Sequence, residues 1–136
     1  MSFLVDANVL CEATRPQPEA RVLAWLERHD ATLHISTLTL AEILRGIHLL
    51  PAGRKRRALE SWFDELLASF AGRIVPFDED AARTWAAFHA RQERKGRSLP
   101  SFDSLIAATA LAHGLTLATR NTADFPEEVP VVNPWT

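Results

Sequence analysis

The sequence predicts an α/β fold: a single domain, residues 1–136, with a central, mostly parallel sheet of four to five strands and helices on both faces. Two observations lead to this prediction. Short apolar runs rich in leucine or β-branched residues alternate with longer segments of helical spacing, which is typical of parallel sheets covered by helices. The chain also has the length of one domain, 136 residues, without repeats or a Gly/Ser-rich linker that would divide it.

The first half of the chain begins with a strand and contains most of the expected helices. Apolar runs predict strands over Phe3–Val5 and Thr32–Ile35. Apolar side chains at helical spacing predict helices over Glu19–His29, Leu38–Leu50 and Arg54–Ala71. In the third helix these side chains form a single stripe, which indicates one face packed against a core.

The second half continues the alternation. Strands are predicted over Arg73–Val75, Leu115–Ala118 and Val129–Val132, and helices over Asp78–Lys95 and Phe102–His113. The last helix is rich in alanine, so we expect it to pack close to the sheet. Crossovers should be right-handed, and ligands of such sheets bind beyond the carboxyl ends of the strands.

Composition limits the class of protein. A net charge of −2 and a pI near 6.2 argue against nucleic-acid binding by bulk positive charge, although they allow a local basic patch. The chain is 47% hydrophobic and 24% charged, as expected of a soluble globular domain. Cys11 is the one cysteine, which excludes an internal disulfide and makes the cytoplasm the expected location. No apolar run approaches the ~20 residues of a membrane span, so we expect no membrane association.

Four carboxylates lie at the edges of apolar segments: Asp6, Glu42, Asp103 and Asp124. Three of them follow a strand or begin a helix, where the loops of a doubly wound sheet gather, and Glu42 can reach the same place from a helix. Four carboxylates cannot converge without repelling one another unless a cation holds them. An oxygen-only ligand set favours Mg²⁺ or Mn²⁺ over Zn²⁺.

Each carboxylate also has a purely structural interpretation. Asp6 could cap a helix that starts near Ala7, and Asp103 could cap the alanine-rich helix, with Ser101 as a rival for that position. Glu42 could pair with Arg45 three residues on, and Asp124 could form an Asx-turn before the Phe-Pro dipeptide. The sequence alone leaves these alternatives open for each residue taken singly.

Four sequence blocks together resemble one family. They are LVDANVL, STLTLAEILRG, FDSLIAATALAHGLTLATRNTADF and the closing NPW, and they span essentially the whole chain in order. They are similar to the PIN-domain family, in particular to the VapC or FitB-like toxins of bacterial toxin–antitoxin pairs. Two departures are Ser104, where alanine is common, and the acidic loop PEEVP.

The resemblance implies an endoribonuclease whose acidic quartet holds one or two Mg²⁺ ions, with Mn²⁺ able to substitute. The quartet falls on Asp6, Glu42, Asp103 and Asp124, and small polar residues that support it fall on Asn8, Thr119 and Asn121. Such an ion would activate a water molecule and neutralise the charge that develops on the phosphodiester. Asp6 and Asp103 would be the principal ligands, whereas Glu42 and Asp124 would complete the site, hold a second ion or position the water.

The resemblance also implies partners. They are an antitoxin of the VapB type, an RNA substrate and a second copy of the chain in a homodimer, possibly within a higher toxin–antitoxin assembly. The antitoxin would place a hydrophobic segment in a surface groove and extend a basic residue to the acidic site. Apolar helix surface within Glu19–Leu50 or Arg54–Ala71 could form the dimer interface, and the sequence does not choose between them.

Two basic clusters could meet RNA. Arg54, Lys55, Arg56 and Arg57 are interpreted as a solvated helix end. Arg91, Arg94, Lys95 and Arg97 lie just before Asp103, where a loop could steer phosphates towards the metal.

Two other functions remain alternatives. The chain could be a catalytically weak PIN-fold binding module whose acids serve as caps, or a metal-dependent phosphohydrolase that acts on DNA or small phosphate esters.

Overall fold

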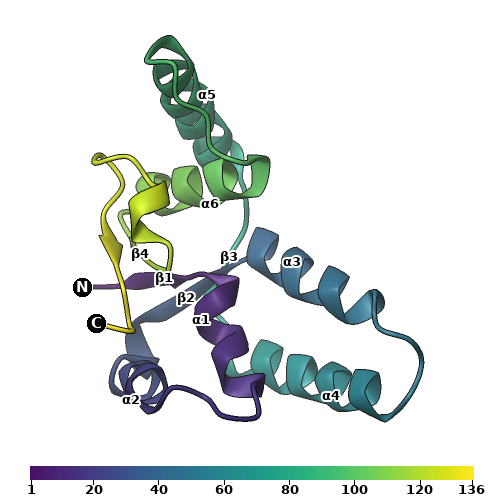
Figure 1. The fold of residues 1–136 in the computed structure, drawn as a ribbon. Coiled ribbons are helices and arrows are strands. Elements are labelled where there is room, and N and C mark those ends of the chain that lie inside the picture. The colour runs from purple at the N-terminus through teal and green to yellow at the C-terminus, as the bar shows by residue number, and fades with distance from the viewer.

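The computed structural model describes all residues from Met1 to Thr136 and contains one five-stranded sheet in which every neighbouring pair of strands is parallel (Figure 1). The strand order is β3-β2-β1-β4-β5. The strands are β1 (Phe3–Val5), β2 (Leu33–Ser36), β3 (Ile74–Val75), β4 (Thr116–Ala118) and β5 (Val131–Val132). The predicted α/β class and parallel sheet are therefore confirmed.

Six α-helices cover the sheet. They are α1 (Ala7–Cys11), α2 (Ala20–Arg28), α3 (Thr37–His48), α4 (Arg54–Ser69), α5 (Glu79–Arg94) and α6 (Ser101–Ala112). Three short 3₁₀ turns complete the fold: η1 (Glu12–Thr14), η2 (Asp30–Thr32) and η3 (Thr122–Asp124). The five predicted helices are confirmed to within two residues at each end, and α1 is an additional short helix. No helix is long and apolar enough to cross a membrane.

One boundary of the predicted strands is wrong for a physical reason. The last strand was expected to start at Val129, but β5 starts at Val131. The Val129 amide donates to the Pro126 carbonyl in a turn, at 3.0 Å, and Pro130 has no amide hydrogen to donate. The strand therefore pairs regularly only after Pro130.

The central strand separates two hydrophobic cores. Phe3 and Val5 point into one core, which contains side chains of α1, α2, α3 and α4, and Leu4 points into the other, which contains side chains of α5 and α6. Figure 1 shows these two layers of helices on opposite sides of the strands. Ala107 and Ala110 of α6 are fully buried in the second core, which confirms that the alanine-rich helix packs close to the sheet.

The strand order places a topological switch point between β1 and β4. From β1 the chain builds β2 and β3 on one side, and then returns to add β4 directly on the other side of β1. Loops that follow such neighbouring strands diverge and leave a crevice at their carboxyl ends. The residues at these two ends are Asp6 and Thr119.

Candidate functional site

Asp6 is the most enclosed of the four acidic residues, with 7% of its surface exposed. Its Oδ1 accepts a hydrogen bond from the Ala7 amide at 2.8 Å, and it stands at the N-cap position of α1. Its Oδ2 accepts a hydrogen bond from the Thr119 hydroxyl at 2.9 Å. Capping and a position in the crevice were considered as alternatives for this residue, and the structure shows both at once.

A small polar network holds Asp6 across the switch point. The Asn8 side-chain amide donates to Thr119 Oγ1 at 3.2 Å and to Asp6 Oδ2 at 3.4 Å. The Asn121 backbone amide donates to Thr119 Oγ1 at 3.2 Å. Of the three predicted supporting residues, Asn8 and Thr119 therefore contact Asp6 through their side chains, whereas Asn121 contributes its backbone.

Glu42 reaches the site from the middle of α3, which starts where the Ser36 hydroxyl caps the Leu38 amide at 3.0 Å. Its Oε1 is buried and has no hydrogen-bond partner. Burial raises the pKa of Glu42, and the neighbouring charges of Asp6 and then Asp103 raise it further. No ion pair joins Glu42 to Arg45, so the structural interpretation from the sequence does not hold.

Asp103 lies in the first turn of α6. The helix starts at Ser101, and Pro100 occupies its N-cap position without a side-chain hydrogen bond. The interpretation of Asp103 or Ser101 as the cap is therefore wrong. Burial raises the pKa of Asp103, followed by the charges of Asp6 and Asp124.

Asp124 is the most open member of the set. It ends the 3₁₀ turn η3 after β4 and is exposed. Its effect on the pKa of Asp103 places it near the same site. Its carboxylate makes neither an ion pair nor the hydrogen bond of an Asx-turn, so it is available to a ligand.

The four carboxylates share one electrostatic environment, although no three of them form a closed coordination group in this arrangement. Burial is also the main cause of the raised pKa of Asp6, against the lowering effect of its hydrogen bonds from Thr119 and Ala7. Like charges held near one another repel, so a cation between them would stabilise the site. The oxygen donors and the unpartnered Glu42 Oε1 fit a divalent cation, because such an atom needs a positive partner and finds none in the chain.

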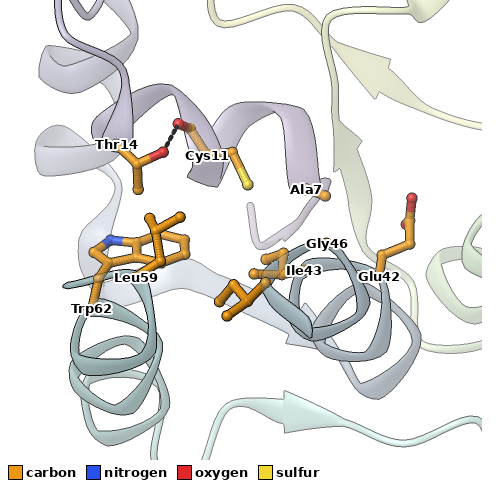
Figure 2. Close-up of a pocket in the computed structure, with 9 residues that line it drawn as sticks. Ala7, Cys11, Thr14, Glu42, Ile43, Gly46, Leu59 and Trp62 are labelled. Atoms are coloured by element: carbon orange, nitrogen blue, oxygen red, sulfur yellow. Dashed lines mark hydrogen bonds between the residues drawn. The ribbon is translucent and has the colours of Figure 1, made fainter. Parts of the chain in front are cut away.

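A groove lies beside Glu42, between α1, α3 and α4, and the sequence did not predict its position (Figure 2). It has a volume of about 230 Å³ and is mainly apolar, with Ala7, Cys11, Ile43, Gly46, Leu59 and Trp62 among its lining residues. Gly46 leaves open space on α3, since a Cβ there would meet nothing within 4 Å. A glycine inside a helical pattern was the one sequence signal for this groove.

Cys11 belongs to the apolar lining of this groove, and Glu42 is the acidic residue at its edge. Figure 2 shows the Cys11 sulfur pointing into the space between the helices and the Glu42 carboxylate standing at its edge. Burial raises the pKa of the Cys11 thiol, and the charges of Glu42 and Asp6 raise it further. The thiol therefore stays neutral and belongs to the apolar lining.

In the basic cluster of Arg91, Arg94, Lys95 and Arg97, only Arg91 forms an ion pair. The Arg91 guanidinium donates to Glu128 Oε2 at 2.8 Å, and the Gln92 side chain donates to Glu128 Oε1 at 2.9 Å. Glu128 of the acidic loop thus binds α5 while it remains exposed. Arg97 lines a hollow together with Asp124, so it is the predicted RNA-contact residue that the fold brings beside an acid of the quartet.

Arg97 also lines a second hollow, together with Arg91 and Lys95, that faces Glu127 and Glu128. Arg94 is exposed in the last turn of α5. Arg97 therefore adjoins an acid of the quartet through one hollow and two of the other predicted RNA contacts through the next.

Comparisons with known proteins agree on one family. The model of the PIN domain matches residues 3–127. The toxin FitB of Neisseria gonorrhoeae is 42% identical over 136 residues, which cover 98% of each chain. The VapC ribonuclease Y4jK of Sinorhizobium fredii is 38% identical over 136 residues, covering 98% of this chain and 97% of that protein. The crystal structure of FitAcB from Neisseria gonorrhoeae superimposes with a TM-score of 0.91 at 41% identity, covering 98% of each chain.

Proposed function

This chain belongs to the PIN-domain family, among its VapC-type toxins, and from that premise we propose that it is a metal-dependent endoribonuclease that acts as the toxin of a toxin–antitoxin pair. The observation that carries the proposal is the grouping of Asp6, Glu42 and Asp103 at the switch point, where burial raises the pKa of all three and neighbouring carboxylates raise those of Glu42 and Asp103 further. Glu42 lies within α3 and caps no helix, and its buried Oε1 has no donor in the chain.

Asp6, Glu42, Asp103 and Asp124 would hold the cation, Mg²⁺ or Mn²⁺. When bound, such an ion lowers the pKa of a coordinated water molecule and neutralises charge on the phosphate. The raised pKa values mean that protons compete for these oxygens, so cation binding should weaken as the pH falls.

The chain's own groups prepare the reaction. Thr119 and Asn8 fix the direction of Asp6 Oδ2, and the Ala7 amide fixes Oδ1. Glu42 Oε1 has no partner within the chain, so it is free to complete the coordination of the cation or to position the attacking water. Arg97, beside Asp124, would contact the phosphate backbone of the RNA.

The apolar groove supports an antitoxin as partner. One relative of known structure is the FitAcB complex, and the groove between α1, α3 and α4 ends at Glu42. An apolar segment of an antitoxin could fill it and place a basic side chain against the acids. A second apolar groove between α2 and α4, lined by Leu26, Trp62 and Leu66, would suit a homodimer interface.

A cleavage assay tests the proposed function. Labelled RNA, single-stranded DNA and a phosphomonoester are incubated with the protein in Mg²⁺ and in EDTA. Cleavage of RNA alone, only with Mg²⁺, supports the proposal. Turnover of DNA or the monoester in preference to RNA identifies the broader phosphohydrolase, and no turnover of any substrate identifies the binding module.

A further inference from the structure

Arg120 carries a guanidinium that lies over an aromatic ring next to the candidate site and is not paired with an acid. We propose that Arg120, held in place by Trp135, binds a phosphate of the RNA strand that flanks the acidic site. This inference rests on the proposed function and adds a contact that the two basic clusters in the sequence did not indicate.

The contacts around Trp135 define where the Arg120 side chain lies. The guanidinium carbon of Arg120 lies 5.0 Å from the centre of the Trp135 ring. From the other side, Arg21 of α2 donates to the Trp135 carbonyl at 3.2 Å. The Trp135 amide donates to Asn133 Oδ1 at 2.9 Å, and the Asn133 side chain donates to the Arg120 carbonyl at 3.4 Å. The C-terminal turn therefore contacts Arg120 twice: Asn133 donates to its backbone carbonyl, and the Trp135 ring lies against its guanidinium.

Arg120 is also connected directly to the acidic site. Its backbone amide donates to Asn8 Oδ1 at 3.2 Å, and the Asn8 side chain in turn contacts Asp6. Arg120 follows Thr119, which donates to Asp6. A strand of RNA bound across the carboxyl ends of β1 and β4 would pass over this residue.

The charge and shape of Arg120 suit a phosphate. None of the six ion pairs of the structure includes Arg120 or Arg21, although both are exposed. A guanidinium that stacks on an aromatic ring keeps its N–H groups free at the edge of its plane, and these can bind a phosphate in two places. The ring also restricts the rotamers of a long side chain, so less conformational entropy is lost on binding.

An unpaired cation at this place meets a need of RNA binding. Four carboxylates at the crevice repel a polyanion, so the rim must supply cations if RNA is to bind there. Arg91 is neutralised in part by Glu128, whereas Arg97, which shares a hollow with Asp124, and Arg120 form no ion pair.

The test measures RNA binding directly. Binding of a short labelled single-stranded RNA is followed by fluorescence anisotropy in a buffer that contains Ca²⁺. The salt concentration is varied from about 50 to about 200 mM, and each sample is checked for intact RNA. Arg120→Ala should lose roughly tenfold or more in affinity at low salt, as for one charge-assisted hydrogen bond. The slope of log affinity against log salt should fall by about 0.7, the value for one phosphate contact on a single strand.

Three further variants make the result specific. Arg120→Lys should keep the salt slope and lose part of the affinity, because lysine keeps the charge but cannot donate the two parallel N–H bonds of a guanidinium. Trp135→Leu should also keep the salt slope and lose part of the affinity, because Arg120 keeps its charge but loses the ring that restricts its rotamers. Arg28→Ala is the matched control: Arg28 is an exposed, unpaired arginine that shares a hollow with Met1 and Phe3, at the amino end of β1, and its loss should change neither quantity.

Three outcomes would overturn the proposal. One is wild-type affinity and salt slope in Arg120→Ala. Another is an effect on binding of the antitoxin without any effect on RNA, which would assign the Arg120–Trp135 pair to the protein interface. The third, no RNA binding by the wild type, would remove the proposed function together with this inference.

Discussion

At the scale of single residues, the site depends on how one carboxylate uses its two oxygens. Asp6 Oδ1 accepts from the backbone of α1, and Oδ2 accepts from Thr119 on the neighbouring strand end. These bonds lower the pKa of Asp6, but burial outweighs them, so the pKa is raised. Asp6 is thus held in place without being fully compensated, which leaves it able to bind a cation.

Asp6→Asn and Asp103→Asn should each abolish Mg²⁺-dependent RNA cleavage while the fold survives. An amide oxygen has no negative charge and binds a divalent cation more weakly, yet it keeps the shape of the side chain. Asparagine is as good an N-cap as aspartate, so α1 should not lose stability. Cleavage time courses and circular dichroism measure the two effects. Rates like the wild type in both variants would refute the site assignment.

Thr119→Val should weaken cation binding and move the pH dependence of cleavage to higher pH. The hydroxyl donates to Asp6 Oδ2 and lowers the pKa of that carboxyl, so its loss should raise this pKa further. Rates measured across pH 5 to 9, roughly the range in which such groups titrate, would detect the shift. Thr109→Val is the control, because the Thr109 hydroxyl donates at 2.8 Å to Leu105 of its own helix. Equal profiles for both variants would contradict the prediction.

At the scale of elements, the orientation of α6 determines where Asp103 lies, and a side-chain contact joins this helix to α5. The Trp85 indole donates to the buried Ser104 hydroxyl at 3.1 Å, and that hydroxyl donates to the Ser101 carbonyl at 2.8 Å. Ser104 follows Asp103 directly. The serine that departs from the usual alanine of the family thus connects the two helices beside the site.

Ser104→Ala should destabilise the protein by about 1 to 3 kcal/mol, because it leaves the Trp85 N–H without its partner. Metal-dependent cleavage should persist under conditions where the variant is folded, since no carboxylate is changed. Urea unfolding measures the first effect and the RNA assay the second. Ser69→Ala, at an exposed hydroxyl in α4, should lose much less stability. A Ser104 variant as stable as the wild type would show that this bond contributes nothing.

At the scale of the whole molecule, the fold could be predicted because its signals are local and repeated. The apolar stripe of Arg54–Ala71 and the alanines of Phe102–His113 each specify a packed helix without knowledge of the partner element. Strand edges were less predictable, as at Val129, because a turn hydrogen bond and a proline decide where pairing begins.

The candidate site could be predicted only in part. The acids could be found because charged residues at the ends of apolar runs are unusual, and the roles assigned to them stay predictions. The pairing of Arg91 with Glu128 and the position of Arg120 over Trp135 join residues far apart in the chain, and no local pattern indicates them. The groove beside Glu42 likewise arises from three helices together.

In the metal-free protein, the acidic site should lower the free energy of unfolding as the pH rises. This is the reverse of the usual case, in which carboxylates stabilise the folded state more at higher pH. The pKa values of Asp6, Glu42 and Asp103 are raised above 3.8, 4.5 and 3.8, so the folded state binds more protons than the unfolded state between these ordinary values and the raised ones. Stability then falls as the pH rises through that window. In EDTA, this site should therefore raise the melting temperature as the pH is lowered through that window.

Asp6→Asn and added Mn²⁺ separate this effect from the titration of the rest of the chain. The variant removes one of the repelling charges, so in EDTA its melting temperature should be no lower than that of the wild type and should change less with pH. A cation at a hundred times its Kd adds roughly 2.7 kcal/mol to the folded state, which corresponds to a rise on the order of several degrees. This rise should shrink in Asp6→Asn and, in the wild type, should fade as the pH drops and protons displace the cation.

Asp6→Ala serves as the control for capping, because loss of the cap should cost about 1 kcal/mol with or without metal. Calorimetric scans in which Asp6→Asn and the wild type respond alike to pH and to Mn²⁺ would mean that Asp6 only caps α1.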